Sequence, residues 1–128
     1  MRLLLDTHLL IWTACASPRL SLAAKRMIDD PANEVMFSAA SIWEIAIKFQ
    51  QGKTDFPFDP AVLRTGFLDN GYQELMVSGE HGIAASALPL IHKDPFDRLL
   101  LAQATVENIL LLTVDPILAR YPGPVRAV

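Results

Sequence analysis

Three short apolar runs, each too brief to form a helix, constrain the fold of this chain more than any other feature. Residues 2–5, 34–37 and 109–113 have the length and the aliphatic content of buried strands. Segments with helical periodicity separate them, and the clearest of these covers residues 95–108. Buried strands that alternate with helices predict a mostly parallel sheet with helices packed on both faces, in three α/β/α layers.

Caps, prolines and glycines delimit the other expected elements. Residues 72–77 and 125–128 are two further candidate strands, which bring the sheet to four or five strands. Helices are expected at 8–16, 21–30, 41–50, 61–69 and 79–88, with a loop at 54–60 and a helical turn at 116–120. The chain of 128 residues contains no internal repeat, so we expect a single domain over 1–128.

An acidic residue stands close to each point where a predicted strand gives way to a helix. Asp6 and Asp115 each follow a strand, Glu44 lies shortly after another, and Asp97 opens the long helix. The carboxyl ends of parallel strands share one edge of the sheet, where ligands bind, so we expect these side chains to converge. Four converging carboxylates would repel one another, and a divalent, oxygen-preferring metal ion is the natural partner to neutralise them.

Each acid also has a purely structural explanation. Aspartate is a favoured N-cap, and Asp94 and Asp115 each precede a proline, as residues at helix starts often do. Glu44 stands four residues before Lys48, the spacing of an ion pair on a helix surface. The apolar residues around Glu44 and Asp97 favour the metal hypothesis, because a carboxylate held against an apolar core requires a partner.

The combination of these pieces resembles a PIN domain. The resemblance rests on Asp6-Thr7 after the first strand, SIWEI at 41–45, HKDPFDRLLLAQA at 92–104 and LTVD at 112–115. The chain is most similar to the VapC-type toxins of bacterial type II toxin–antitoxin pairs, over essentially its whole length. The resemblance implies a PIN-like α/β/α fold and an endoribonuclease that hydrolyses RNA phosphodiester bonds with carboxylate-bound Mg²⁺ or Mn²⁺.

The resemblance also implies roles for individual residues. The family's metal-binding acids, which are also its catalytic residues, fall on Asp6, Glu44, Asp97 and Asp115. Asp6 and Asp97 would hold the principal metal ion, and the other two would complete the site directly or through water. Possible helpers are Asp94, Thr113, Thr7 and Arg98. Lys48, Lys93 and Arg98 either contact RNA phosphates or are solvated charges that balance nearby carboxylates.

Composition bears on the partners. Fifty-two per cent of the residues are hydrophobic, so we expect a homodimer or an apolar groove for a partner. The region with Phe49, Phe56, Phe58 and Phe67 is either core or the groove for a cognate antitoxin that the resemblance implies. The net charge of −3 argues against a broad basic RNA-binding face, but bound metal ions would supply positive charge locally.

The remaining features point to an ordinary cytoplasmic protein. Cys15, the single cysteine, is expected to be a buried and inert thiol. His8, His81 and His92 lack the spacing of a zinc site, and His92 either assists the acidic site or is a loop residue. Trp12 and Trp43 lie on apolar helix faces, which indicates core or interface. No apolar run approaches the ~20 residues needed to span a bilayer.

Two other functions stay open at this point. A non-catalytic PIN-like protein-binding module would keep the same acids only as helix caps. A Mg²⁺-dependent phosphatase of the haloacid dehalogenase type also begins with an Asp after its first strand. That class needs a second Asp two residues later, and His8 stands there.

Overall fold

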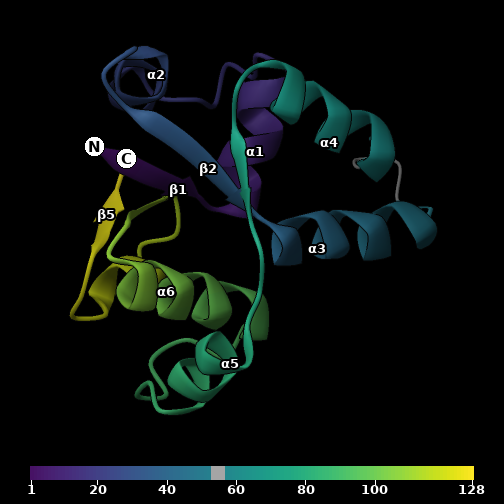
Figure 1. The fold of residues 1–128 in the computed structure, drawn as a ribbon. Coiled ribbons are helices and arrows are strands. Elements are labelled where there is room, and N and C mark those ends of the chain that lie inside the picture. The colour runs from purple at the N-terminus through teal and green to yellow at the C-terminus, as the bar shows by residue number, and fades with distance from the viewer. Residues whose placement is uncertain (53–56) are drawn as a thin grey trace.

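The computed structural model of this protein describes residues 1–52 and 57–128 and contains one parallel sheet (Figure 1). Its strands are β1 (Arg2–Leu5), β2 (Glu34–Ser38), β3 (Gln73–Leu75), β4 (Leu110–Thr113) and β5 (Val125–Ala127), in the order β3-β2-β1-β4-β5. Every pair of neighbouring strands is parallel. The predicted fold class and the upper limit of five strands are therefore confirmed.

Helices lie on both faces of this sheet. They are α1 (Thr7–Ala14), α2 (Leu22–Asp29), α3 (Ala39–Gln50), α4 (Pro60–Asp69), α5 (Gly79–Ser86) and α6 (Pro95–Glu107), followed by a 3-10 turn η1 (Leu118–Arg120). In Figure 1, α1, α2 and α4 lie on one side of the sheet, while α6 lies on the other with α5 beyond it. No helix in the described part of the chain has the length and apolarity to cross a membrane.

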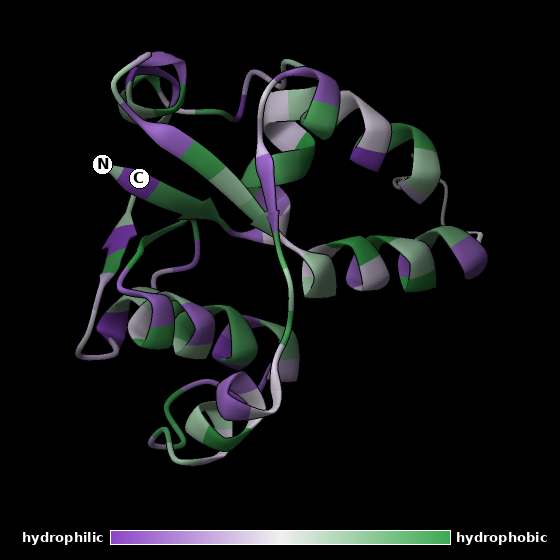
Figure 2. Cartoon of the chain, in the orientation of Figure 1, coloured by the Kyte–Doolittle hydropathy of each residue, from purple (hydrophilic) through white to green (hydrophobic). Residues whose placement is uncertain are grey.

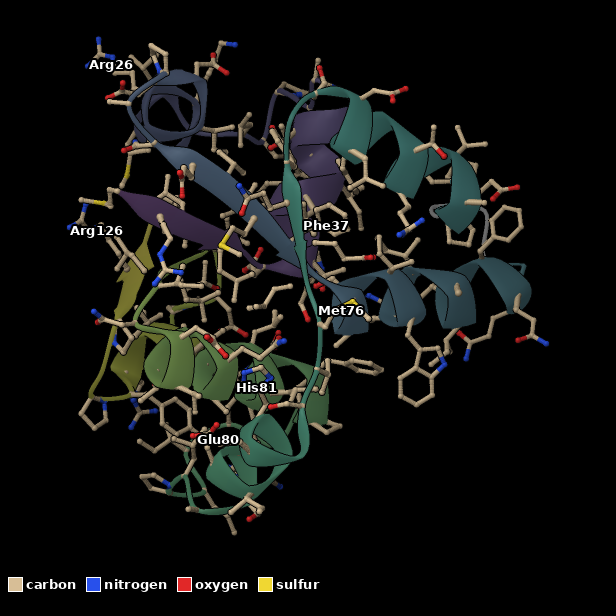
Figure 3. The ribbon with its side chains drawn as sticks, in the orientation of Figure 1. Arg26, Phe37, Met76, Glu80, His81 and Arg126 are labelled. Atoms are coloured by element: carbon tan, nitrogen blue, oxygen red, sulfur yellow. The ribbon has the colours of Figure 1, made fainter. Side chains whose placement is uncertain are left out.

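The alternation of side chains along the strands builds two cores. Leu3 and Leu5 of β1 pack with Phe37 against α1, α2 and α4, whereas Leu4 packs on the opposite face with Leu100 and its neighbours in α6. Because both faces are covered, the strands need apolar residues at consecutive positions. Figure 2 shows this hydrophobic colouring continuing along β1, and Figure 3 shows Phe37 among the side chains beside β2.

The order of the strands defines where a site is expected. The chain passes from β1 to β2 and β3 on one side, and then returns to place β4 on the other side of β1. The carboxyl ends of β1 and β4 therefore flank the point where the strand order reverses, which is where open α/β sheets bind ligands. The backbone N–H of Asp6 donates to Leu112 O across this junction at 3.0 Å.

Polar caps shift several element boundaries from those expected. Ser38 accepts from Ala40 N and starts α3 two residues before the expected position, and Asp6 caps α1 so that it starts at Thr7. The strand expected at 72–77 is only three residues long, because Ser78 already caps α5. Part of the loop expected at 54–60, including Phe56, lies outside the described residues.

The burial of three features differs from what the sequence led us to expect. Cys15 is exposed rather than buried, because α1 ends at Ala14 and Cys15 occupies the C-cap. Trp43 is 64% exposed and does not belong to the core of this chain. The aromatic region is split, since Phe67 is buried against Phe37 of β2 whereas Phe49 is 42% exposed. Side-chain direction on a short helix depends on its neighbours, which composition alone does not specify.

Candidate metal centre

Asp6 lies at the carboxyl end of β1 and is held by three hydrogen-bond donors. Its Oδ1 accepts from Leu9 N at 2.8 Å as the N-cap of α1. Its Oδ2 accepts from Thr113 Oγ1 at 2.6 Å and from Val114 N at 3.1 Å, both at the end of β4. Burial raises the pKa of Asp6, and these hydrogen bonds oppose the shift. The carboxylate is thus fixed in place but retains a lone pair on Oδ1.

Glu44 reaches the same edge of the sheet from the second turn of α3. Thr7 Oγ1 donates to Glu44 Oε1 at 2.7 Å and lies 3.0 Å from Ser41 Oγ. Glu44 Oε2 lies 3.4 Å from Lys48 Nζ, so the ion pair that the spacing suggested does form. Glu44 is nevertheless buried, because its helix packs against both α4 and α6. The ion pair with Lys48 is therefore compatible with a position of Glu44 at the acidic site.

Asp97 lies in the first turn of α6 and has few partners. Asp94 caps the helix by accepting from Phe96 N at 2.8 Å and from Asp97 N at 3.4 Å. Among the described residues, His92 is the one donor close to the Asp97 carboxylate, with Nε2 3.3 Å from Oδ2. Burial and the charges of Asp94, Glu44 and Asp6 together raise the pKa of Asp97 to about 7, and His92 only partly opposes this shift.

Asp115 completes the group after β4. Its Oδ2 lies 2.6 Å from His92 Nε2, and its Oδ1 accepts from Ile117 N at 2.8 Å. Its own N–H donates to Thr113 Oγ1 at 2.9 Å, so the same hydroxyl connects Asp115 to Asp6. Burial acts to raise the pKa of Asp115, but His92 and the backbone N–H groups of Ile117 and Leu118 together outweigh it and lower the pKa.

The four acids predicted from the sequence therefore lie along one edge of the sheet. A series of contacts runs from Asp6 through Thr113 to Asp115, and through His92 to Asp97. Glu44 is joined to the start of α1 through Thr7, and its charge acts on Asp97. The predicted helpers Thr7, Thr113 and Asp94 all belong to this arrangement.

The donor set fits a hard divalent cation. Carboxylate oxygens are the ligands that Mg²⁺ prefers, and Mg²⁺ keeps several of its waters, so a few acids suffice. In the described part of the chain, no lysine or arginine forms an ion pair with Asp6, Asp97 or Asp115. Asp97 has the largest number of unengaged lone pairs, and three acidic neighbours raise its pKa. A cation near Asp97 would offset the repulsion from its acidic neighbours.

Arg98, by contrast, is directed away from these acids. Its guanidinium donates to the carbonyl oxygens of Ala85 at 2.9 Å, Pro89 at 3.0 Å and Leu88 at 3.2 Å. It thereby binds the end of α5 and the loop after it. Arg98 is a structural residue of this loop and not one of the groups around the carboxylates. Lys93 is exposed, so its side chain remains accessible from solvent.

Two residues near the site carry weak sequence signals. The sequence left open whether His92 assists the acidic site or is only a loop residue. In the structure its ring lies between Asp97 and Asp115. Tyr121 was not singled out, yet its buried hydroxyl accepts from His92 N at 2.8 Å and donates to Pro89 O at 2.7 Å. The position of His92, two residues before the helix-capping Asp94, is the sequence feature that could have indicated its place at the site. No feature of the sequence indicates the role of Tyr121.

The other histidines and the exposed tryptophan have different surroundings. His81 points from α5 toward α6 in Figure 3, where its Nε2 lies 3.0 Å from Glu107 Oε1. The rings of Trp43 and Phe96 are in edge-to-face contact, with centroids 5.5 Å apart. Each ring belongs to the residue just before one of the acids, so this aromatic pair borders the site.

Comparisons with known proteins agree with this geometry. The family model described as PIN domain matches residues 3–124. The structure of VapBC2 from Rickettsia felis, bound to a DNA fragment from its promoter, is similar with a TM-score of 0.73 and 17% identity, covering 99% of this chain and 98% of that one. DNA-bound VapBC from Salmonella typhimurium gives 0.70 and 17%, with 99% and 98% covered. VapBC-5 from Mycobacterium tuberculosis gives 0.68 and 16%, with 99% and 97% covered. No curated protein matches the chain.

Proposed function

The chain belongs to the PIN domain family, and from this premise we propose that it is a metal-dependent endoribonuclease that acts as the toxin of a toxin–antitoxin pair. Its reaction would be the hydrolysis of RNA phosphodiester bonds with carboxylate-bound Mg²⁺ or Mn²⁺. Membership of this family also argues against the phosphatase alternative.

The observation that carries the proposal is the uncompensated negative charge around Asp97. This carboxyl has a pKa of about 7 because it is buried beside Asp94, Glu44 and Asp6. Groups with strongly shifted pKa values at the ligand-binding edge of a parallel sheet are candidates for functional residues. A divalent cation would restore the carboxylate to its charged form and remove the repulsion at the same time.

Each residue then has a distinct task. Asp97 and Asp6 would hold the principal metal ion, and Glu44 and Asp115 would complete the site directly or through water. When bound, the metal supplies an activated water and stabilises the negative charge that develops on the phosphate. Thr113 holds Asp6 by a hydrogen bond of 2.6 Å. Thr7 orients Glu44 at 2.7 Å.

The protein partners are also part of the proposal. The similar structures include a member of the VapBC family of toxin–antitoxin systems and a toxin–antitoxin complex from Klebsiella pneumoniae. We propose a cognate antitoxin and a homodimer in the cytoplasm for this chain. Support comes from large apolar side chains that are exposed on the single chain, among them Trp43, Met76, Ile83 and Leu90. A monomeric mass by light scattering at micromolar concentration would contradict the homodimer.

A non-catalytic binding module is the second candidate. The observation in its favour is that Asp6 and Asp94 do cap α1 and α6, which explains both residues without a metal ion. That explanation does not extend to Asp97, which caps no helix and lies against other acids. The two candidates differ in whether a divalent cation binds and whether RNA is cut.

Cleavage of a total-RNA pool, with and without Mn²⁺, tests the proposal. We expect Mn²⁺-dependent fragments from the wild-type protein and none from Asp6→Asn or Asp97→Asn. Asp29→Asn is the matched control, because Asp29 is an exposed acid near the amino end of β2, paired with Lys25. Undiminished cleavage by either site variant, or none by the wild type, would contradict the nuclease assignment. Mapping the fragment ends would identify the cleaved sequence.

A further inference from the structure

We propose that His92 is a positioning residue that orients Asp115 as a hydrogen-bond donor, and that it is not itself a metal ligand. This inference rests on the proposed metal-dependent function. The alternative is that His92 itself binds the metal ion. Ligand atoms of His92, Asp97 and Asp115 all lie within 4.8 Å of one another, close enough to suggest that the three share one ion.

The position of the imidazole proton decides between these two roles. Asp94 N, a backbone donor, points at His92 Nδ1 with an N···N distance of 3.0 Å. Nδ1 must therefore accept, and the proton of the neutral ring resides on Nε2. That nitrogen lies 2.6 Å from Asp115 Oδ2, which is the geometry of an Nε2–H donor to a carboxylate.

Metal coordination by the same nitrogen would disrupt this arrangement. A ligating Nε2 must present a lone pair, so the proton would have to move to Nδ1. Nδ1–H would then face the N–H of Asp94, and two donors would oppose each other at 3.0 Å. The turn between His92 and the cap of α6 would lose a hydrogen bond as a result. The ring is therefore organised to donate.

The backbone around His92 is anchored firmly enough to keep the ring in this orientation. Tyr121 Oη accepts from His92 N at 2.8 Å and from Ile91 N at 3.2 Å. Arg98 Nη1 lies 3.2 Å from the same hydroxyl and also binds Pro89 O. Arg98 therefore does not contact the acids. Its guanidinium instead stabilises the loop that carries His92.

The consequence for Asp115 is a fixed carboxylate with free lone pairs. Oδ2 accepts from His92 and Oδ1 accepts from Ile117 N, and the backbone N–H of Leu118 also interacts with the carboxylate. Each oxygen retains acceptor capacity toward a cation or its water shell. Hydrogen-bonding partners of this kind typically contribute 10–100-fold to metal affinity. His92 would thus raise the metal affinity indirectly, by holding the Asp115 carboxylate in its orientation.

Two substitutions separate the two nitrogens of the ring. In His92→Asn, the side-chain oxygen can still accept from Asp94 N, but no donor reaches Asp115. In His92→Gln, the amide nitrogen can occupy the place of Nε2 and donate to Asp115. We expect Mn²⁺ affinity, measured by electron paramagnetic resonance, to fall about 10–100-fold in His92→Asn. His92→Gln should recover most of that loss.

Two spectroscopic measurements on the wild-type protein complete the test and do not depend on how the variants fold. Imidazole ¹⁵N shifts of the metal-free protein should identify the Nε2–H tautomer. Electron spin echo spectra of the Mn²⁺-bound protein should lack the coupling of a directly bonded imidazole nitrogen. The Nδ1–H tautomer, a bonded nitrogen, or equal affinity in His92→Asn and wild type would each overturn the role of His92. Failure of the wild type to bind Mn²⁺ would instead overturn the proposed function on which it rests.

Discussion

Asp6 and Asp97 belong to the same group of acids, but the protein stabilises their carboxylates very differently. Asp6, 2% exposed, accepts from Leu9 N at 2.8 Å, from Thr113 Oγ1 at 2.6 Å and from Val114 N at 3.1 Å. The Asp97 side chain, 19% exposed, has one neighbouring donor among the described residues, His92 Nε2 at 3.3 Å. The more deeply buried carboxylate is thus the one with more hydrogen-bond donors.

This difference shows which part of the site depends on a cation. Burial raises the pKa of both acids, but in Asp6 three hydrogen bonds act in the opposite direction. In Asp97 three acidic neighbours add to the shift and only His92 opposes it. The side formed by β1 and β4 is preorganised by the fold itself, while the side formed by α6 remains electrostatically unfavourable until a positive charge arrives.

The largest effect that this comparison predicts is stabilisation by metal. Mn²⁺ at about 100 times its dissociation constant should raise the free energy of unfolding of the wild-type protein by about 2.7 kcal/mol. Asp97→Asn should lose most of this increase, because it removes the carboxylate with the most unengaged lone pairs. Chemical denaturation with and without Mn²⁺ measures the effect, and NaCl at equal ionic strength is the control. An equal increase in the variant would show that Asp97 does not hold the ion.

The next effect is the pH dependence of the metal-free protein. The pKa of Asp97 is raised from its ordinary 3.8 to about 7, so the folded state holds a proton that the unfolded chain has released between these values. The free energy of unfolding should therefore fall as pH rises from about 4 to about 7. Asp97→Asn should be more stable than the wild type by on the order of 2 kcal/mol at about pH 8. This is about half of the full linkage value, because water screens a partly exposed carboxylate.

The control for this prediction lies at the opposite edge of the sheet. Asp29 is exposed and pairs with Lys25 at 3.1 Å. Asp29→Asn should change the free energy of unfolding by less than about 0.5 kcal/mol at any of these pH values. Denaturation curves at about pH 4 and pH 8 compare the two variants. If Asp97→Asn is no more stable than the wild type at the higher pH, the repulsion around Asp97 is not real.

The sequence predicted the sheet and the convergence of the acids because both depend on local patterns. Leu3 to Leu5 and Leu110 to Leu112 are apolar at consecutive positions, which a strand covered on both faces requires. Once those strands are parallel, the acids that follow them must share an edge. The resemblance of the motifs to the PIN domain added the identity of the family, which the family model matching residues 3–124 confirms.

What the sequence did not predict depends on side-chain direction and on distant contacts. Trp43 neighbours the buried Glu44, but the next residue on a helix points about 100° away, here toward solvent. The role of His92 requires Tyr121, which lies 29 residues later in the chain. Arg98 was expected near RNA or in solvent, and its engagement with Pro89 depends on how the loop before α6 folds back. Such placements follow from tertiary packing and leave no periodic pattern in the sequence.

The smallest of the predicted effects concerns the well-stabilised side of the site. Thr113→Val keeps the shape of the side chain but removes the hydroxyl that donates to Asp6 Oδ2 and accepts from Asp115 N. We expect the metal-free protein to lose about 1.5 kcal/mol of stability, the low end for a hydrogen bond to a charged group. The loss is limited because Asp6, whose pKa burial already raises, can take up a proton when a donor is removed.

Thr13→Val is the matched control, because the Thr13 hydroxyl donates only to Leu9 O within its own helix. Its effect on unfolding should be within about 0.5 kcal/mol. The sign of the change in the free energy of unfolding distinguishes the two sides of the site most clearly. Removing a hydrogen-bond donor beside Asp6 should destabilise the metal-free protein, whereas removing the charge of Asp97 should stabilise it. Equal signs for Thr113→Val and Asp97→Asn would mean that the two carboxylates share one environment, and the division of the site into a preorganised side and a cation-dependent side would be wrong.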